Sequence, residues 1–287
     1  MSRNYYCLIA GLPDILLEDK KTGQFLNGYR QLLSESLHPD DLKLISLLYL
    51  PFDHKNIVSV YFKQNTPFDN RANYNLEDVE ILIDKRRIEL NEPSVFPNYI
   101  NEVVESVITS DEPTSPNILE FLLSKAYWNY LSTNKNKFIK RLAEYEITQR
   151  NVFTALNTRK HNINVNNQLV GDNEITEALI RSKSRDFGLA GEIDNIEQMI
   201  LIFENDNLLE RELKIDTLKW QFIDDSTFFN YFSIEKLLGF TAKLLLVERW
   251  IGLEHESGQM LFAKLLNDLK TEFKIPEDYT LNHGKNK

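Results

Sequence analysis

The chain has 287 residues, and its 43 acidic against 33 basic side chains give a formal net charge of −10. Because nucleic-acid binding draws on Lys and Arg to neutralise phosphates, this charge argues against a nucleic-acid partner, and it also disfavours contact with an anionic leaflet. No apolar stretch approaches the ~20 residues that a membrane-spanning helix needs, and the N-terminal apolar run lacks a signal-peptide cleavage site. We therefore expect a cytoplasmic protein.

The single cysteine, Cys7, lies in the apolar run 5–10. One thiol cannot form an internal disulfide, and a free cysteine in an apolar run is usually buried and inert. A chain of this length can bury enough apolar surface to fold without a disulfide or a metal. We expect Cys7 to be buried and residues 1–287 to form a single helical domain.

Helical periodicity dominates the sequence, in which Gly and Pro number only 10 and 9. In chain order, the predicted helices cover residues 24–37, 42–50, 76–90, 119–130, 134–160, 174–182, 193–203, 208–223, 234–253 and 258–273. The runs 5–10 and 58–62 are the only plausible strands, and two short strands do not make a sheet-based fold. The predicted class is all-α, with at most two short strands near the N-terminus.

The longest predicted helix, 134–160, carries a heptad seam of apolar residues that Gln149 interrupts. At 1.5 Å per residue it would run about 40 Å, and such a seam is usually covered by an antiparallel neighbour within the chain. The polar, Asn-rich stretch 161–173 that follows is the best candidate for a boundary between two lobes. We expect a multi-helix bundle of long antiparallel helices.

Segment 234–253 carries apolar side chains all round the predicted helix, which is typical of a central element. Glu248 falls among leucines on this helix, and an isolated buried carboxylate would be costly. We predict that Glu248 forms an ion pair with an Arg or Lys of a neighbouring helix, and Arg211 is the suggested partner. The alternative is that Glu248 faces a binding partner.

The sequence offers no recognisable catalytic chemistry. None of the five His pairs with another at the i, i+4 spacing of a helical metal site, and the Gly-rich phosphate loops and the Gly-x-Ser-x-Gly motif are absent. Asp224 and Asp225 are adjacent, and we expect them to cap the segment that follows. We predict a protein that is not an enzyme and has no cofactor or metal site. An enzyme with an unfamiliar active site is the alternative, and it would need a pocket of ionisable groups with perturbed pKa values.

Residues 151–160, followed by 169–175, form one stretch, and residues 233–250 form another; both resemble the C subunit (also called d) of V-type and archaeal-type ATPases. In that family an acid and an Asn on a long helix lead into a basic helix end, which a Gly-containing loop and a further helix follow. Glu146 and Asn151 stand at the acid and Asn positions. Arg159 lies at the basic end, although Asn157 stands where the pattern has Arg, and Gly171 lies in the loop.

The second stretch, 233–250, resembles the C-terminal helix of the same family. That helix has an aromatic residue after a small one, then a Lys, and then an acid followed closely by Arg. Lys243, Glu248 and Arg249 stand at the last three positions.

The opening residues 5–13, with 186–189 and 248–250, also resemble a bacterial family of otherwise uncharacterised proteins that are encoded among V-type ATPase subunits. The resemblance implies a funnel-shaped helical protein built on quasi-repeated helical units. It implies a non-catalytic central-stalk (rotor) subunit that couples the cytoplasmic stalk to the membrane proteolipid ring. The implied partners are the ring and the central-stalk subunits, which would hold the protein on the inner face of the cell membrane through protein contacts. A helical adaptor or regulatory protein unrelated to the ATPase is the alternative.

Four aromatic residues occupy five consecutive positions: Phe228, Phe229, Tyr231 and Phe232. Burial between helices is the more usual arrangement for such a cluster, and exposure on a binding surface is the alternative. If these aromatic residues form an exposed binding surface, we expect the isolated protein to be a monomer. The other candidates for partner contact or internal ion pairing are Glu146, Asn151, Arg159, Lys243, Glu248 and Arg249.

Overall fold

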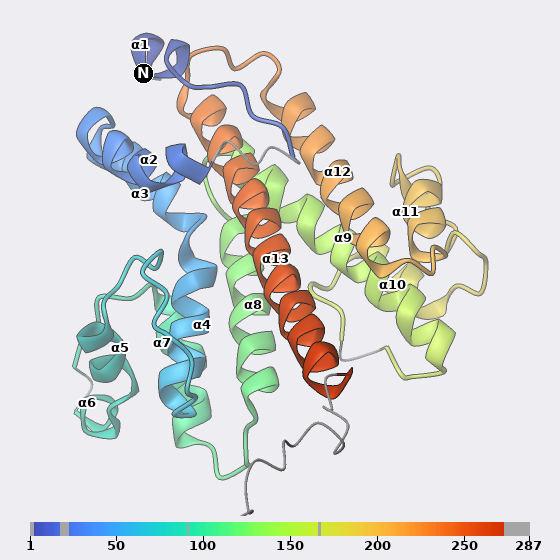
Figure 1. Ribbon diagram of the computed structural model, residues 1–287, viewed down its shortest axis with the longest axis horizontal. Helices are drawn as coiled ribbons and strands as arrows, with labels where there is room; N and C mark the ends of the chain where they lie inside the picture. Colours follow the sequence, from blue (N-terminus) through green and yellow to red (C-terminus); the bar gives the residue numbers. More distant parts are fainter. Residues whose placement is uncertain (1–2, 18–22, 91, 166–167, 273–287) are drawn as a thin grey trace, which may run out of the picture.

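The computed structural model describes residues 3–17, 23–90, 92–165 and 168–272, and the side chains of these residues except at 23–27 and 254–272. Every regular element in these ranges is an α-helix, as the all-α prediction expected, and the helices pack against one another (Figure 1). The helices are α1 (Tyr6–Ala10), α2 (Gly23–Ser36), α3 (Pro39–Leu47), α4 (Leu50–Tyr61), α5 (Leu76–Ile83), α6 (Lys85–Glu89), α7 (Asn98–Thr109), α8 (Pro116–Ser132), α9 (Lys137–His161), α10 (Glu174–Arg181), α11 (Ile196–Phe203), α12 (Leu208–Thr227) and α13 (Ile234–Glu272).

The prediction of strands at 5–10 and 58–62 was wrong. The first run is the short helix α1, and the second is the end of α4, which begins with Pro51 in its first turn. A β-branched run favours a strand only through its packing. Here Ile57 and Val58 are buried in a helix that packs against α8, and that burial outweighs the local preference.

Two predicted helix boundaries also differ from the structure. The predicted helix 76–90 is divided at Asp84, whose side chain accepts a hydrogen bond from the backbone N–H of Arg86 and so caps a new helix. The predicted break after residue 253 is absent, because α13 continues through it to Glu272. An isolated Gly costs a helix only about 1 kcal/mol, which is too little to interrupt a long one.

The buried apolar side chains form two clusters, and α9 contributes to both. Phe138, Ile139 and Leu142 belong to the first cluster, which also draws on α2 to α5, α7, α8, α12 and α13. Val152 and Leu156 belong to the second, which also draws on α10, α11 and α12. The change from one cluster to the other therefore falls within α9, and a two-lobe division near 161–173 stays a prediction, as do the quasi-repeated units.

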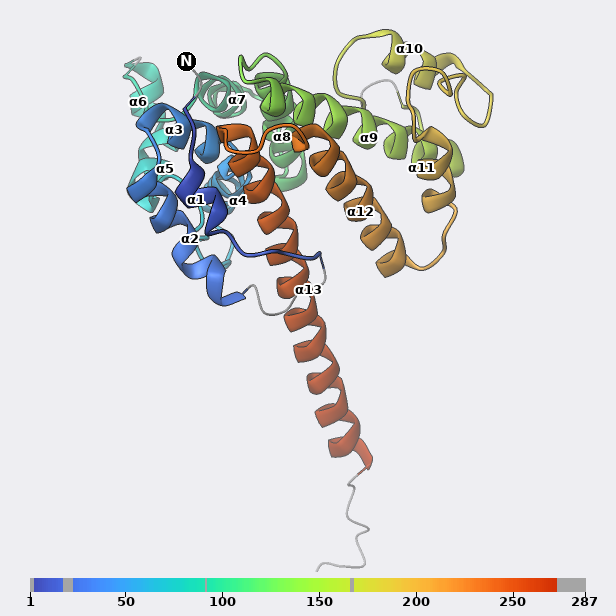
Figure 2. The ribbon, with the colours of Figure 1, turned by 90° about the horizontal axis from the view of Figure 1, so that it is seen from above.

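Helix α13 is the central element of the first cluster and contacts α2, α3, α9 and α12. Leu237, Leu238 and Val247 on it are fully buried. Its C-terminal part projects beyond the other helices, as Figure 2 shows. Within the described ranges, none of the helices has both the length and the apolar character needed to cross a membrane.

Helices α12 and α13 cross closely at Gly239. A Cβ atom at this position would lie 2.7 Å from Thr227 Cγ2 and 3.2 Å from Ile223 Cγ2. The first distance is shorter than packed carbon atoms allow and the second is tight, so a larger residue at position 239 would force Thr227 or the two helices to shift. The crossing fixes the turn between α12 and α13, which carries the aromatic residues described next.

Candidate functional site

An exposed aromatic surface lies where α12 turns into α13. Phe228, Phe229, Tyr231 and Phe232 are 63, 81, 61 and 39 % exposed, and Tyr6 of α1 beside them is 55 % exposed. We call these five residues the aromatic patch. A group of solvent-exposed aromatic side chains is typical of a protein-binding surface, because such side chains contribute strongly to the binding free energy when a partner buries them.

Short contacts hold the aromatic patch in shape. The ring centroids of Tyr6 and Phe232 are 4.5 Å apart, and those of Phe228 and Phe229 are 4.9 Å apart in an edge-on arrangement. The backbone N–H of Tyr5 donates to the Phe232 carbonyl at 2.7 Å. The N-terminal segment (residues 3–17) therefore supplies part of the patch and is anchored to it.

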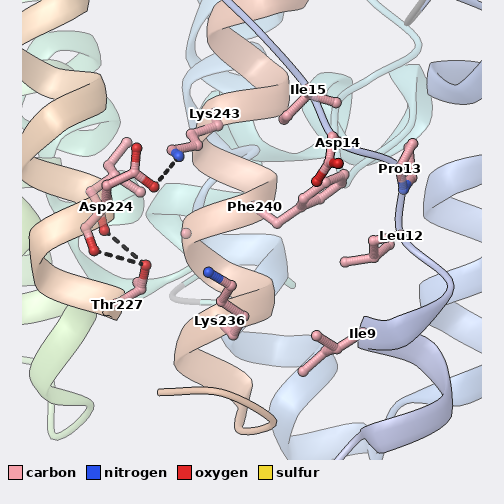
Figure 3. Close-up of a pocket in the computed structure, with 12 residues that line it drawn as sticks. Ile9, Leu12, Pro13, Asp14, Ile15, Asp224, Thr227, Lys236, Phe240 and Lys243 are labelled. Carbon is pink, nitrogen blue, oxygen red and sulfur yellow. Dashed lines mark hydrogen bonds and ion pairs between the residues drawn. The ribbon is translucent and has the colours of Figure 1, made fainter. Parts of the chain in front are cut away.

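A pocket of about 260 Å³ lies between the N-terminal segment and helices α12 and α13 (Figure 3). Lys236 and Lys243 of α13 and Asp224 of α12 line one wall, and Asp14 lies on the wall formed by the N-terminal segment. Lys243 forms an ion pair with Asp224, and its ammonium lies 4.5 Å from the centre of the Trp220 ring. Burial lowers the pKa of Lys243, and Asp224 opposes that effect. Asp224 and Asp225 both lie within α12, so the prediction that they cap the segment after them was wrong.

Most of the other candidate residues hold helices together. Glu146 of α9 pairs with Lys219 of α12. Arg249 of α13 donates to both carboxylate oxygens of Asp216, at 2.8 and 3.1 Å, and Asp216 is 4 % exposed. The Trp250 indole donates to the same carboxylate at 2.8 Å. Burial raises the pKa of Asp216, against the lowering effect of Arg249. These ionic contacts join α9, α12 and α13.

Glu248 forms an ion pair, as expected, but its partner is Arg71 of the loop between α4 and α5, at 3.2 Å, and not a residue of a neighbouring helix. The suggestion of Arg211 was wrong, and Arg211 lies instead over the ring of Phe203. The reason is helix geometry, because consecutive residues on a helix point about 100° apart. Arg249 takes the side of α13 that faces α12, so Glu248 points towards the loop that follows α4.

Asn151 and Arg159 fix loops to α9. Asn151 is 1 % exposed, donates to the Val170 carbonyl at 2.7 Å and accepts from the Val170 N–H at 2.9 Å. Arg159 donates to the carbonyls of Ser182 and Ser184 at 2.9 and 2.8 Å, and its guanidinium lies 3.8 Å from the centre of the Phe187 ring. The hydrogen bonds that Asn151 and Arg159 form therefore join parts of the same chain.

Two ionisable residues that the sequence did not single out are buried in α4. Asp53 is 0 % exposed and accepts hydrogen bonds from the N–H groups of Asn73 and Tyr74 and from the Asn73 side chain. Burial raises the pKa of Asp53 to about 6. Burial lowers the pKa of His54 to about 3, and its Nε2 lies 2.8 Å from the Tyr99 hydroxyl. Neither residue belongs to a periodic pattern or a motif that could have marked it.

Cys7 is exposed, so the prediction of a buried thiol was wrong. The run 5–10 forms a helix that has no buried residue, because it lies on the surface of the bundle rather than in its core. Across the residues that the structure describes, no group of three or more His, Cys, Asp or Glu side chains is arranged to hold a metal ion.

Comparison with known proteins gives one result. No curated protein and no solved structure matches the chain significantly. A family model described as "Protein of unknown function (DUF2764)" matches residues 1–273. The chain therefore belongs to the DUF2764 family.

Proposed function

We propose that the protein is a non-catalytic subunit that binds another protein through the aromatic patch. The observation that carries this proposal is the exposure of the patch, in which Phe229 is 81 % exposed and its neighbour Phe228 63 %. Aromatic residues on protein surfaces contribute strongly to binding when a partner desolvates them. The hydrogen bond from the Tyr5 N–H to the Phe232 carbonyl and the contact of the Tyr6 and Phe232 rings hold the patch in place.

The proposed partners are the central-stalk and proteolipid-ring subunits of a V-type ATPase. This part of the proposal rests on the resemblance of residues around Glu146, Asn151 and 233–250 to the C subunit of such ATPases. The role would be to couple the stalk to the ring, on the inner face of the cell membrane, without nucleotide or cofactor. A protein-protein contact suits a chain with a net charge of −10, which anionic lipids would repel.

The test is affinity purification of the tagged full-length protein, at native expression level, from solubilised membranes of its host. Mass spectrometry then identifies what purifies with it. The proposal expects ring and central-stalk subunits in stoichiometric amounts. Recovery of an unrelated soluble protein instead would support the adaptor function and remove the ATPase assignment.

A further inference from the structure

The N-terminal segment (residues 3–17) lies across the end of the bundle but is held there weakly. Every residue in it is exposed or partly exposed, and its partly buried apolar side chains, such as Ile9, Leu12 and Ile15, pack against the edge of the core without being buried in it. Segments with few buried contacts open at a lower free energy than the core does. The segment is thus the part of this surface that is easiest to displace.

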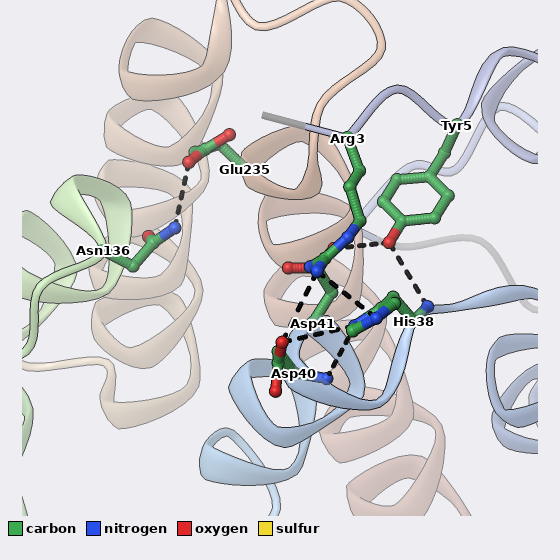
Figure 4. A network of polar contacts seen from close by, with 7 residues as sticks. All are labelled: Arg3, Tyr5, His38, Asp40, Asp41, Asn136 and Glu235. Atoms are coloured by element: carbon green, nitrogen blue, oxygen red, sulfur yellow. Dashed lines mark hydrogen bonds and ion pairs between the residues drawn. The ribbon is translucent and has the colours of Figure 1, made fainter. Parts of the chain in front are cut away.

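The polar part of its anchor lies near residues 38–41 (Figure 4). Arg3 donates to Asp41 at 3.4 Å and to Asp40 at 3.5 Å, and the Arg3 side chain is 43 % exposed. The Tyr5 hydroxyl also donates to Asp41, and the Arg3 guanidinium lies 3.3 Å from the ring of His38. Exposed ion pairs of this kind stabilise a structure only slightly.

The surface under the segment is incompletely filled. The pocket of about 260 Å³ lies between Ile9, Leu12 and Ile15 of the segment and the helices beneath them. We call the opposing residues the α12–α13 surface; they are Ile223, Asp224, Thr227, Lys236, Gly239, Phe240 and Lys243. A volume of this size would hold several further side-chain carbon atoms, so the segment is not the best-fitting occupant.

The α12–α13 surface carries one positive charge that the helices themselves leave unbalanced. Lys243 is paired with Asp224, whereas no carboxylate in the described part of the chain forms an ion pair with Lys236. Asp14 of the N-terminal segment supplies an acid on the opposite wall (Figure 3). The present occupant is therefore apolar with one acid, and the surface favours that chemistry.

We propose that the N-terminal segment is a displaceable occupant of the α12–α13 surface, and that an apolar segment of the partner protein, carrying an Asp or Glu, takes its place. The partner's acid would pair with Lys236, and its apolar side chains would fill the pocket beside the aromatic patch. Displacement would also uncover the face of Phe232 that Tyr6 now contacts. This inference rests on the proposed protein-binding function. It adds the chemistry of the partner segment, and it makes the N-terminal segment a competitor for the surface that the partner binds.

The test uses a fluorescently labelled synthetic peptide with the sequence of residues 5–17, in which Ser replaces the cysteine. It is titrated against the full-length wild type, Arg3→Glu, and Arg3→Glu combined with either Lys236→Glu or Lys85→Glu. Lys85 is an exposed residue of α6, far from the pocket, and serves as the matched control. The Arg3→Glu change places like charges beside Asp40 and Asp41 and should loosen the segment.

We expect Arg3→Glu to bind the peptide roughly threefold more tightly than the wild type, the size expected for exposed ion pairs. Adding Lys236→Glu should cancel that gain, and adding Lys85→Glu should not. Equal affinity of wild type and Arg3→Glu, or no binding by either, would overturn the proposal. So would equal effects of the two lysine changes.

Hydrogen exchange gives a second, independent measurement. The amides of Ile9 and Gly11, which bond within the segment, should exchange at least 100-fold faster than that of Val247 in the core. Equal protection would show that the segment does not open and would overturn the proposal. Neither experiment needs the natural partner, so their failure would leave the docking function standing, and a failed affinity purification would leave the displaceable segment standing.

Discussion

Replacing Asn151 by Ala tests whether this residue supports the fold rather than contacting a partner. Its two hydrogen bonds with Val170, at 2.7 and 2.9 Å, hold the loop before α10 against α9. Ala would leave the N–H and the carbonyl of Val170, which is 0 % exposed, without partners. Since each unsatisfied buried group costs about 1–3 kcal/mol, we expect the free energy of unfolding to fall by about 3 kcal/mol.

Urea unfolding followed by far-ultraviolet circular dichroism measures this loss. Asn151→Asp should be at least as destabilised as Asn151→Ala, because a carboxylate oxygen would face the Val170 carbonyl. Asn157→Ala changes an exposed Asn on the same helix and should lie within about 0.5 kcal/mol of the wild type. A loss below about 1 kcal/mol for Asn151→Ala, together with weakened partner binding, would refute the structural assignment.

Two further predictions concern pH and packing. Burial raises the pKa of Asp53 from 3.8 to about 6, so the folded state keeps a proton that the unfolded state has lost, and stability falls as the pH rises through that window by about 3 kcal/mol. Urea titrations at about pH 4 and about pH 7 should show this loss of unfolding free energy in the wild type but not in Asp53→Asn. An equal loss in the two proteins would contradict the reasoning. Gly239→Ala should cost about 1–3 kcal/mol in thermal unfolding, because its Cβ would meet Thr227 at 2.7 Å. Gly252→Ala in the same helix has no atom within 4 Å of the new Cβ and should gain about 0.5–1 kcal/mol, so equal effects would contradict the close crossing.

The sequence predicted best the helices whose ends carry their own signals. Asn136 accepts hydrogen bonds from the first backbone N–H groups of α9, and Asn207 does the same for α12, so periodicity and capping agree there. It failed at α4, where the run 58–62 reads as a strand and only packing against α8 decides otherwise. Local propensity cannot supply that information, because it depends on a helix about 60 residues later in the chain.

The candidate site was only partly predictable for the same reason. Adjacent aromatic residues at Phe228 and Phe229 mark a cluster, but their spacing does not say whether it faces the core or the solvent. The close crossing at Gly239 and the anchoring of Tyr5 to Phe232 decide that. An acid on an apolar helix predicts a basic partner by charge alone, and which one it meets depends on how the helices are rotated, as Arg71 shows.

The most direct test of the central claim compares the tagged wild type with Phe229→Ser and Leu90→Ser in affinity purification from solubilised host membranes. Phe229 is 81 % exposed in the aromatic patch, and Leu90, at the end of α6, is 68 % exposed away from it. Quantitative mass spectrometry should find the same partner proteins with the wild type and with Leu90→Ser, and at least about tenfold less of them with Phe229→Ser. Equal recovery of the partners by all three proteins would contradict the assignment of the aromatic patch as the binding surface.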